Sequence, residues 1–109
     1  MTDTIKVLGQ SNPSATTLTD MYTVPANTST TISTMTVANR SASATSFRVS
    51  VAVGGSADSN EQYLYYDIPI TGNDTFAFTF GVTLSATDVV RVYTVDATLS
   101  FNLFGVEVT

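Results

Sequence analysis

Residues 75–82 read TFAFTFGV, with an apolar residue at every even position. Residues 47–53, FRVSVAV, repeat the pattern with the apolar residues at odd positions. Side chains alternate between the two faces of a β-strand, so each segment is predicted to be a strand with one face in a core. The residues expected in that core are Phe47, Val49, Val51, Val53, Phe76, Phe78, Phe80 and Val82.

Weaker alternation marks the other expected strands, and Pro, Gly and Asn lie between them. These strands are expected at residues 4–8, 17–23, 30–38, 63–70, 89–95 and 98–108. The apolar phase changes near Ser33 and Thr34, which predicts a bulge, and Gly105 predicts a kink. No stretch keeps a period of about 3.6 residues, so no substantial helix is expected. The sequence predicts an all-β fold of about eight strands, a two-sheet β-sandwich resembling a jelly roll.

A polar stretch at residues 9–15 separates a short apolar segment from the rest of the chain. The expected organisation is an N-terminal strand or arm with its linker, residues 1–15, followed by one β-sandwich domain, residues 16–109. Ile5, Val7 and Leu8 are interface candidates: they either form the first strand of their own sheet or add to the sheet edge of a neighbouring subunit. We favour the arm, because the flexible linker loosens the coupling between the two parts.

The composition excludes several classes of function. The chain has 109 residues, no His, Cys or Trp, and nine acidic against four basic residues, a net charge of −5. An acidic chain with dispersed Arg residues repels phosphate backbones, so no nucleic acid is expected as a partner. No apolar run is long enough to span a membrane, and no signal peptide is recognisable. The expectation is a protein made in the cytoplasm, not secreted, with no membrane partner.

No catalytic residue, cofactor or metal is predicted. Nucleophilic catalysis needs a base beside the nucleophile, and both His and Cys are missing. Carboxylates could in principle hydrolyse glycosides or hold calcium in the loop at residues 54–60. Asp58, Asp74 and Asp88 occupy loop or strand-entry positions, where Asp usually caps turns, and no calcium-loop spacing accompanies Asp58 and Glu61. The protein is therefore expected not to be an enzyme.

Residues 63–70 carry the one aromatic cluster that points to a contact surface. Simple alternation places Tyr63, Tyr65 and Asp67 on the outer face of the strand, where tyrosines could anchor a protein contact or stack on a sugar ring. Arg48 and Arg91 also project away from apolar neighbours. We expect at least one of them to hold a carboxylate, with Asp67 the best candidate, either within the sheet or across a subunit boundary.

Several segments, in order, resemble a small family of virion structural proteins from tailed bacteriophages, including cyanophages. The resemblance covers residues 17–109. Its segments are residues 22–28 (YTVPANT), 37–41 (VANRS), 47–52 (FRVSVA), 65–70 (YYDIPI), 88–93 (DVVRVY) and 99–105 (LSFNLFG). The resemblance implies a particle component without catalytic residues, made in the cytoplasm of a bacterial host. Small all-β proteins of this kind decorate capsids as cement proteins, commonly as trimers, or form tail, baseplate or fibre modules.

The expected function is a capsid decoration protein that stabilises the head by bridging capsomers. Its expected partners are further copies of itself, as a homotrimer, and the major capsid protein. The alternative is a tail, baseplate or fibre module that uses Tyr63 and Tyr65 to bind a glycan on the host surface. The number of copies per particle separates the two.

Overall fold

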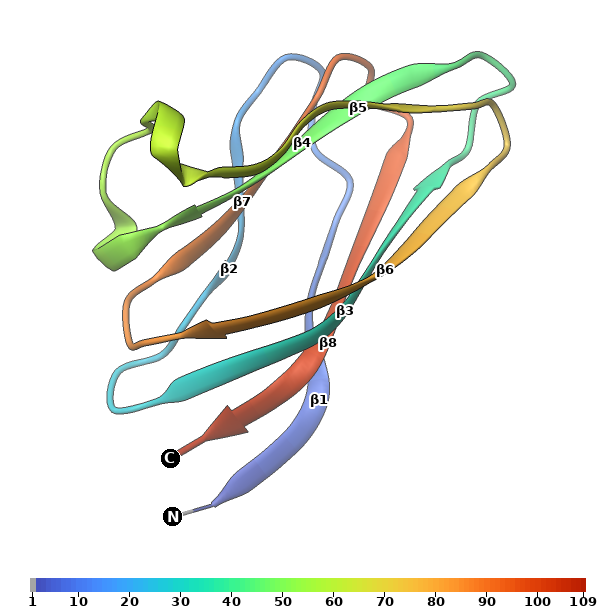
Figure 1. The fold of residues 1–109 in the computed structure, drawn as a ribbon. Coiled ribbons are helices and arrows are strands. Elements are labelled where there is room, and N and C mark those ends of the chain that lie inside the picture. The colour runs from blue at the N-terminus through green and yellow to red at the C-terminus, as the bar shows by residue number, and fades with distance from the viewer. Residues whose placement is uncertain (1) are drawn as a thin grey trace.

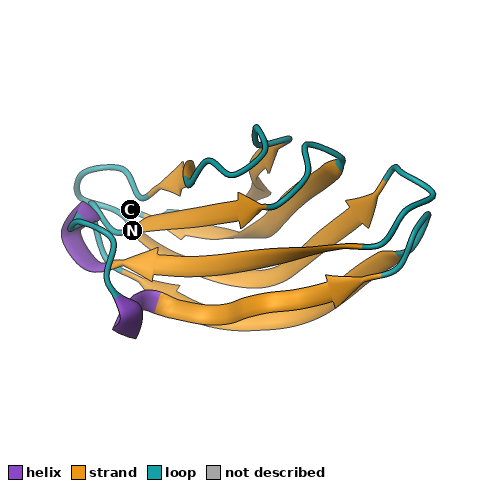
Figure 2. Ribbon diagram, turned by 90° about the horizontal axis from the view of Figure 1, so that it is seen from above, coloured by secondary structure: helices purple, strands orange, loops and turns teal. Residues whose placement is uncertain are grey.

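The computed structural model describes residues 2–109, which fold into two four-stranded antiparallel sheets (Figure 1). Sheet A has the strand order β1-β8-β3-β6 and sheet B the order β2-β7-β4-β5. The two sheets form the two layers visible from above in Figure 2, with short helical turns at one end. The elements are β1 (Asp3–Ser11), β2 (Thr19–Thr23), β3 (Ser29–Asn39), β4 (Thr45–Ala52), η1 (Val53–Gly55), η2 (Asn60–Gln62), β5 (Tyr63–Ile70), β6 (Thr75–Leu84), β7 (Val89–Thr94) and β8 (Leu99–Val108). The predicted all-β sandwich is confirmed.

Alternate residues of the strands meet between the sheets and form one core. Phe47 of β4 and Phe101 of β8 lie at its centre, 1% and 0% exposed, with ring centroids 5.9 Å apart in an edge-to-face arrangement. Met35 and Leu103 pack in the same cluster from sheet A. Burying each of these side chains contributes roughly 1.5–3 kcal/mol. The side chains that fill the core are therefore those that the period-two pattern of the sequence places on one face of each strand.

Irregularities in the strands fall close to where the apolar phase changes. The pairing of β3 with both of its neighbours shifts between Ile32 and Thr34, as the predicted bulge requires. Gly81, with φ +57°, lies opposite this shift on β6. Strand β8 runs through Gly105 without ending, so the register shift lies in its partner β3. Gly105 is required there because a Cβ would lie 2.2 Å from the carbonyl oxygen of Thr31.

Two predicted core residues lie at the surface instead. Val53 is 74% exposed, because the chain leaves β4 at Ala52 and turns through Gly54 and Gly55, both with positive φ. Phe76 is 39% exposed near the start of β6, an edge strand, although its ring still contacts Phe47 at 6.0 Å. Alternation thus identified the strands correctly but not where each strand leaves the core.

The N-terminal segment is not an arm. Strand β1 pairs with β8 of its own sheet from Asp3 to Ser11, and Leu8 is buried in the core. Residues 9–11 of the presumed linker belong to this strand, and Gly9 lies so close to the carbonyl oxygen of Met21 that a Cβ would be 2.9 Å away. The preference for the arm was wrong because the pairing with β8, at the far end of the chain, cannot be read locally. Residues 2–109 therefore form one sandwich that includes β1.

The connections between strands differ in whether they cross from one sheet to the other. Among the described strands, β4 and β5 are the consecutive pair that share a sheet, and each other connection crosses between sheets. The β4–β5 connection, residues 53–62, therefore stays with sheet B. Within residues 2–109 no helix is long and apolar enough to cross a bilayer.

Candidate functional site

The outer face of sheet B carries the predicted ion pair. Arg48 of β4 donates from Nε to Asp67 Oδ1 of β5 at 2.7 Å, and Nη2 lies 3.4 Å from Oδ2. Asp67 has φ +52° and lies where β5 shifts register against β4, so a bulge aims its carboxylate at Arg48. Hydrogen bonding to Asp67 raises the pKa of Arg48 above its ordinary value. The predicted pairing of Arg48 with Asp67 is confirmed, within the sheet.

Aromatic rings enclose the same guanidinium group. The Arg48 Cζ atom lies 4.1 Å from the ring centroid of Tyr66 and 4.5 Å from that of Tyr93, both cation–π distances. Tyr63 meets Tyr66 edge to face at 5.1 Å. We call Arg48, Tyr63, Tyr66 and Tyr93 the tyrosine–arginine cluster. Tyr66 is 55% exposed, so the cluster presents an aromatic surface to solvent beside the Asp67 carboxylate.

Tyr65 does not belong to this outer cluster. Its ring packs 4.7 Å from Phe78 and 6.0 Å from Phe80, on the core side of the sheet. The register shifts in β5 explain the error: one near Asp67 turns Tyr66 outward and Tyr65 inward, and a second between Tyr65 and Tyr63 returns Tyr63 to the outer face. Of the two predicted contact tyrosines, Tyr63 faces outward and Tyr65 does not.

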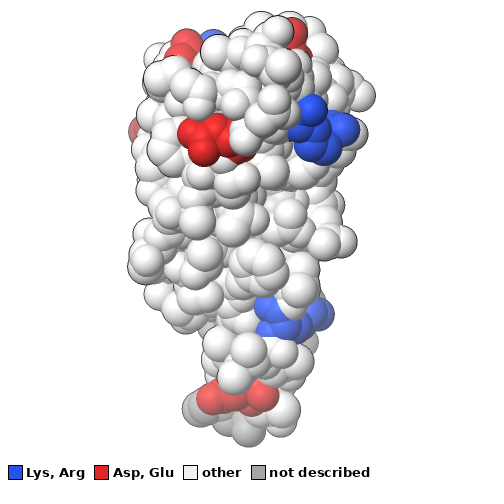
Figure 3. Space-filling view, turned by 90° about the vertical axis from the view of Figure 1, so that its right-hand side faces the viewer, with Lys and Arg blue, Asp and Glu red and all other residues white. Residues whose placement is uncertain are grey.

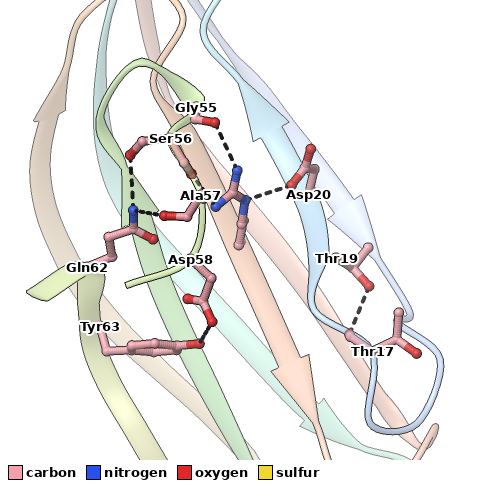
Figure 4. Close-up of polar contacts among 10 residues, drawn as sticks. Thr17, Thr19, Asp20, Gly55, Ser56, Ala57, Asp58, Gln62 and Tyr63 are labelled. Carbon is pink, nitrogen blue, oxygen red and sulfur yellow. Dashed lines mark hydrogen bonds and ion pairs between the residues drawn. The ribbon is translucent and has the colours of Figure 1, made fainter. Parts of the chain in front are cut away.

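Arg91 holds a different carboxylate from the one expected. Its Nε donates to Asp20 of β2 at 2.9 Å, and its Nη atoms donate to the carbonyl oxygens of Ser56 at 2.8 Å and Gly55 at 3.2 Å (Figure 4). Arg91 therefore ties residues 53–62 to the outer face of sheet B. Gln62 adds hydrogen bonds within this loop, from its amide to Ser56 Oγ and to the Ala57 carbonyl oxygen.

The carboxylates near this loop have protein partners. Asp58 accepts a hydrogen bond from the Tyr63 hydroxyl at 3.1 Å, and burial together with that bond raises the pKa of Tyr63. Glu61 accepts one from the Ser59 hydroxyl, which lowers the pKa of Glu61. Residues 2–109 contain no group of three or more His, Cys, Asp or Glu side chains placed to hold a metal ion.

The remaining loop carboxylates cap turns, as their sequence positions predict. Asp88 accepts hydrogen bonds from the backbone NH groups of Gly54 and Ser85, at 2.8 and 2.9 Å. Asp74 accepts from the backbone NH of Thr75 and from the hydroxyl of Thr71. These hydrogen bonds hold the ends of strands together, and they account for the carboxylates at positions 74 and 88.

A polar link joins the sheets at the end of the sandwich where β1 begins and β8 ends. The Tyr22 hydroxyl of β2 donates to Glu107 Oε2 of β8 at 2.6 Å and lies 2.7 Å from Thr30 Oγ1. Burial and the nearby carboxylate raise the pKa of Tyr22 to about 12. The hydrogen bond from Tyr22, together with Lys6 at 3.3 Å, lowers the pKa of Glu107. Lys6 and Glu107 thus form an ion pair at the edge of the core.

The outer face of sheet A is different in kind, and alternation along residues 75–82 predicts its part from β6, where Thr75, Ala77 and Thr79 face solvent or another subunit. Because Leu99, Phe101 and Leu103 point into the core, the alternate residues of β8 point outward. Pairing then places outward residues of all four strands side by side. We call this surface the uncharged face; it consists of Ile5, Val7, Gln10, Thr31, Thr34, Thr36, Ala38, Thr75, Ala77, Thr79, Thr83, Ser100, Asn102, Phe104, Val106 and Val108.

The three interface candidates of β1 lie on opposite sides of sheet A. Ile5 and Val7 are 85% and 48% exposed and lie on the uncharged face, whereas Leu8 lies in the core. Asp3, at the corner of the sheet, is the charged residue described on the same side of β1. The side of the molecule drawn in Figure 3 shows Lys, Arg, Asp and Glu gathered in its upper and lower parts, with a broad region free of them between.

Comparison with known proteins gives a likeness of fold. No family model and no curated protein matches the chain. A chain in the solved structure of infectious bursal disease virus, Gt strain, superposes with a TM-score of 0.55 over 96% of this chain at 6% sequence identity. The match covers 31% of the viral chain, so this protein spans about a third of its length. At this identity the match shows a shared sandwich fold.

Proposed function

We propose that this protein is a non-enzymatic structural component of a virus particle, and specifically a bacteriophage capsid decoration protein that bridges neighbouring capsomers. The observation that carries the proposal is the fold shared, over nearly the whole chain, with part of a chain from the structure of a virus. The ordered resemblance of residues 17–109 to tailed-phage virion proteins supports the same class. The protein would be made in the cytoplasm of the host bacterium and incorporated into the virion.

A decoration protein works by burying surface against a shell and against its neighbours, and it needs no catalytic group or cofactor. Specific contacts of this kind bury about 1,000 Å² or more in total. Ile5, Val7 and the exposed ring of Phe76 provide apolar surface on the edge strands of sheet A. The proposed partners are the major capsid protein and further copies of this chain. The homotrimer implied by the family resemblance stays a prediction.

Imaging of intact particles with an antibody or a fusion tag against this chain tests the proposal. A decoration protein is expected over the whole head in hundreds of copies. Label confined to the tail, at a few to tens of copies, would contradict decoration while keeping the virion role. Absence from purified particles would contradict both.

The alternative is a tail or fibre module that binds a host glycan, and the tyrosine–arginine cluster favours it. The exposed face of Tyr66 offers a stacking surface, and Asp67 and Arg48 lie beside it to hydrogen-bond sugar hydroxyls. Tyr66→Ala and Tyr65→Ala test the two faces of β5 separately. Binding to host polysaccharide should be lost in Tyr66→Ala, whose side chain faces outward, and kept in Tyr65→Ala, whose side chain faces the core. Equal polysaccharide binding by wild type and Tyr66→Ala would exclude the cluster as a glycan site.

A further inference from the structure

We propose that the uncharged face of sheet A packs against the same face of a second copy of this chain, related by a two-fold axis. The pairing would bring two sheets together face to face, as the two sheets of one sandwich already do. It does not depend on the virion role, since it follows from the surface alone.

The apolar part of this face is continuous across two strands. Ile5 of β1 pairs with Val106 of β8, and Val7 pairs with Phe104, so four apolar side chains form two adjacent cross-strand rows. Within sheet A these side chains lie on the side away from the core and are partly or fully exposed. A contiguous apolar patch that is open to water on a β-sheet is typical of a protein contact.

The remainder of the face is made mostly of short, uncharged side chains. Thr34 pairs with Phe104 on one side and with Thr79 on the other, and Thr36 lies between Asn102 and Ala77 in the next row. Threonine hydroxyls can hydrogen-bond to one another across an interface and bring no charge with them. Two such surfaces can therefore approach without large side chains separating them.

The distribution of charge favours a second copy of this chain as the partner that covers the uncharged face. The chain carries a net charge of −5, so two copies repel each other through most approaches. The outer face of sheet B carries the Arg48–Asp67 and Arg91–Asp20 ion pairs, so a second copy packed there would have to desolvate several charges. The uncharged face reduces this cost, because the charged residues described on that side lie at its ends: Asp3 at one corner, and Arg40, which donates to Asn12 Oδ1, beyond the last outward residues of β3. A face without charge is complementary to itself, as a two-fold contact requires.

The size of the face is sufficient for a specific dimer. Four strands spaced by about 4.8 Å, with outward residues over about eight residue steps of 3.3 Å, give a face of roughly 19 by 27 Å. Two such faces hide roughly 1,000 Å² in total, the lower bound for a specific interface. The expected dimer is therefore reversible and dependent on concentration.

Sedimentation velocity from submicromolar to submillimolar concentration tests the pairing. The wild-type chain of 11.5 kDa should shift toward twice that mass as concentration rises. Val7→Lys places a charge in the contact and should weaken dimerisation by about tenfold or more. Leu64→Lys is the matched control: both residues are apolar, 48% exposed and on edge strands, but Leu64 lies in sheet B. The control should dimerise as the wild type does.

Circular dichroism and urea unfolding show whether each variant is folded. If Val7→Lys fails to fold, Thr36→Lys at the centre of the face replaces it, with the same expectation. A wild-type chain that stays monomeric at submillimolar concentration overturns the proposal. A trimer does so too, because a two-fold contact between identical faces cannot close a three-fold ring, and it would favour the homotrimer implied by the family resemblance instead. Equal weakening by Val7→Lys and Leu64→Lys would also contradict it.

Discussion

The two outer faces of the sandwich have the same strand geometry but opposite surfaces: sheet B is charged and sheet A is uncharged. On sheet B, Arg48 and Arg91 each hold a carboxylate, and residues 53–62 fold back over one end. On sheet A the outward positions are threonine, small residues and a patch of apolar side chains. Exposed ion pairs contribute little stability, about 0–1 kcal/mol each, but they keep a face soluble and discourage association. This difference is the basis of the proposal that sheet A packs against a partner while sheet B stays in solvent.

The largest expected effect compares the two sides of β8. Phe101→Ala removes a fully buried ring at the centre of the core and should lower the free energy of unfolding by about 3–5 kcal/mol. Phe104→Ala removes a ring on the uncharged face and should cost under about 1 kcal/mol in the monomer, measured by urea unfolding at low concentration. Similar losses in the two variants would mean that Phe104 is buried within the monomer and that the outer face is misassigned.

On sheet B, removal of the loop anchor should give an intermediate effect. Arg91→Ala leaves Asp20 and the carbonyl oxygens of Gly55 and Ser56 without their donor, and the Arg91 side chain is only 12% exposed. The expected loss is about 1.5–3 kcal/mol, with faster hydrogen exchange of backbone amides in residues 53–62.

Arg91→Lys keeps the charge but not the fork of donors, so it should recover part of the stability and little of the loop protection. If exchange in residues 53–62 is unchanged in Arg91→Ala, the loop is held by Gln62 and Asp88 instead.

The Arg48–Asp67 pair should couple more weakly. Its side chains are 24% and 49% exposed, so a double-mutant cycle with Arg48→Ala and Asp67→Ala should give a coupling free energy under about 1 kcal/mol. The Arg48 single variant should cost more than the coupling energy, because the guanidinium also lies between Tyr66 and Tyr93. A coupling of several kcal/mol would show that the pair is desolvated and that sheet B is itself a contact surface.

The smallest effect concerns pH. The Tyr22 hydrogen bond lowers the pKa of Glu107 in the folded protein, so the folded state binds this proton less readily than the unfolded state. The ionised Glu107 carboxylate stabilises the folded protein fully at pH values above its pKa in the unfolded chain, about 4.3. This stabilisation is lost as the pH falls through the lower pKa of Glu107 in the folded protein. Glu107→Gln should therefore show a shallower fall in melting temperature in acid than the wild type. Identical acid profiles would mean that Glu107 does not contribute.

Much of the strand layout could be predicted because each strand carries its own period-two signal. The pattern of residues 63–70 correctly predicts a strand, yet it exchanges the faces of Tyr65 and Tyr66, because a bulge at Asp67 shifts the alternation by one residue. Pairs distant in sequence were harder still: Arg91 and Asp20 are 71 residues apart, and nothing local distinguishes Asp20 from Asp67 as the partner.

The uncharged face as a whole could not be predicted for the same reason. Its residues come from four strands whose order in the sheet, β1-β8-β3-β6, does not follow the chain. The threonines of residues 29–39 and 75–84 are visible in the sequence, but only the pairing of both strands into one sheet makes them a surface. A long-range pairing of this kind also brings Ile5 and Val7 beside Phe104 and Val106.

Thiol labelling of single-cysteine variants tests most directly whether the two faces are used differently. The chain has no native cysteine, so Val7→Cys and Leu64→Cys each give one reactive thiol, at positions of equal exposure. With rising protein concentration, labelling at position 7 should slow while labelling at position 64 stays constant. Protection of position 64 instead, or of neither position, would contradict the assignment of sheet A as the contact face.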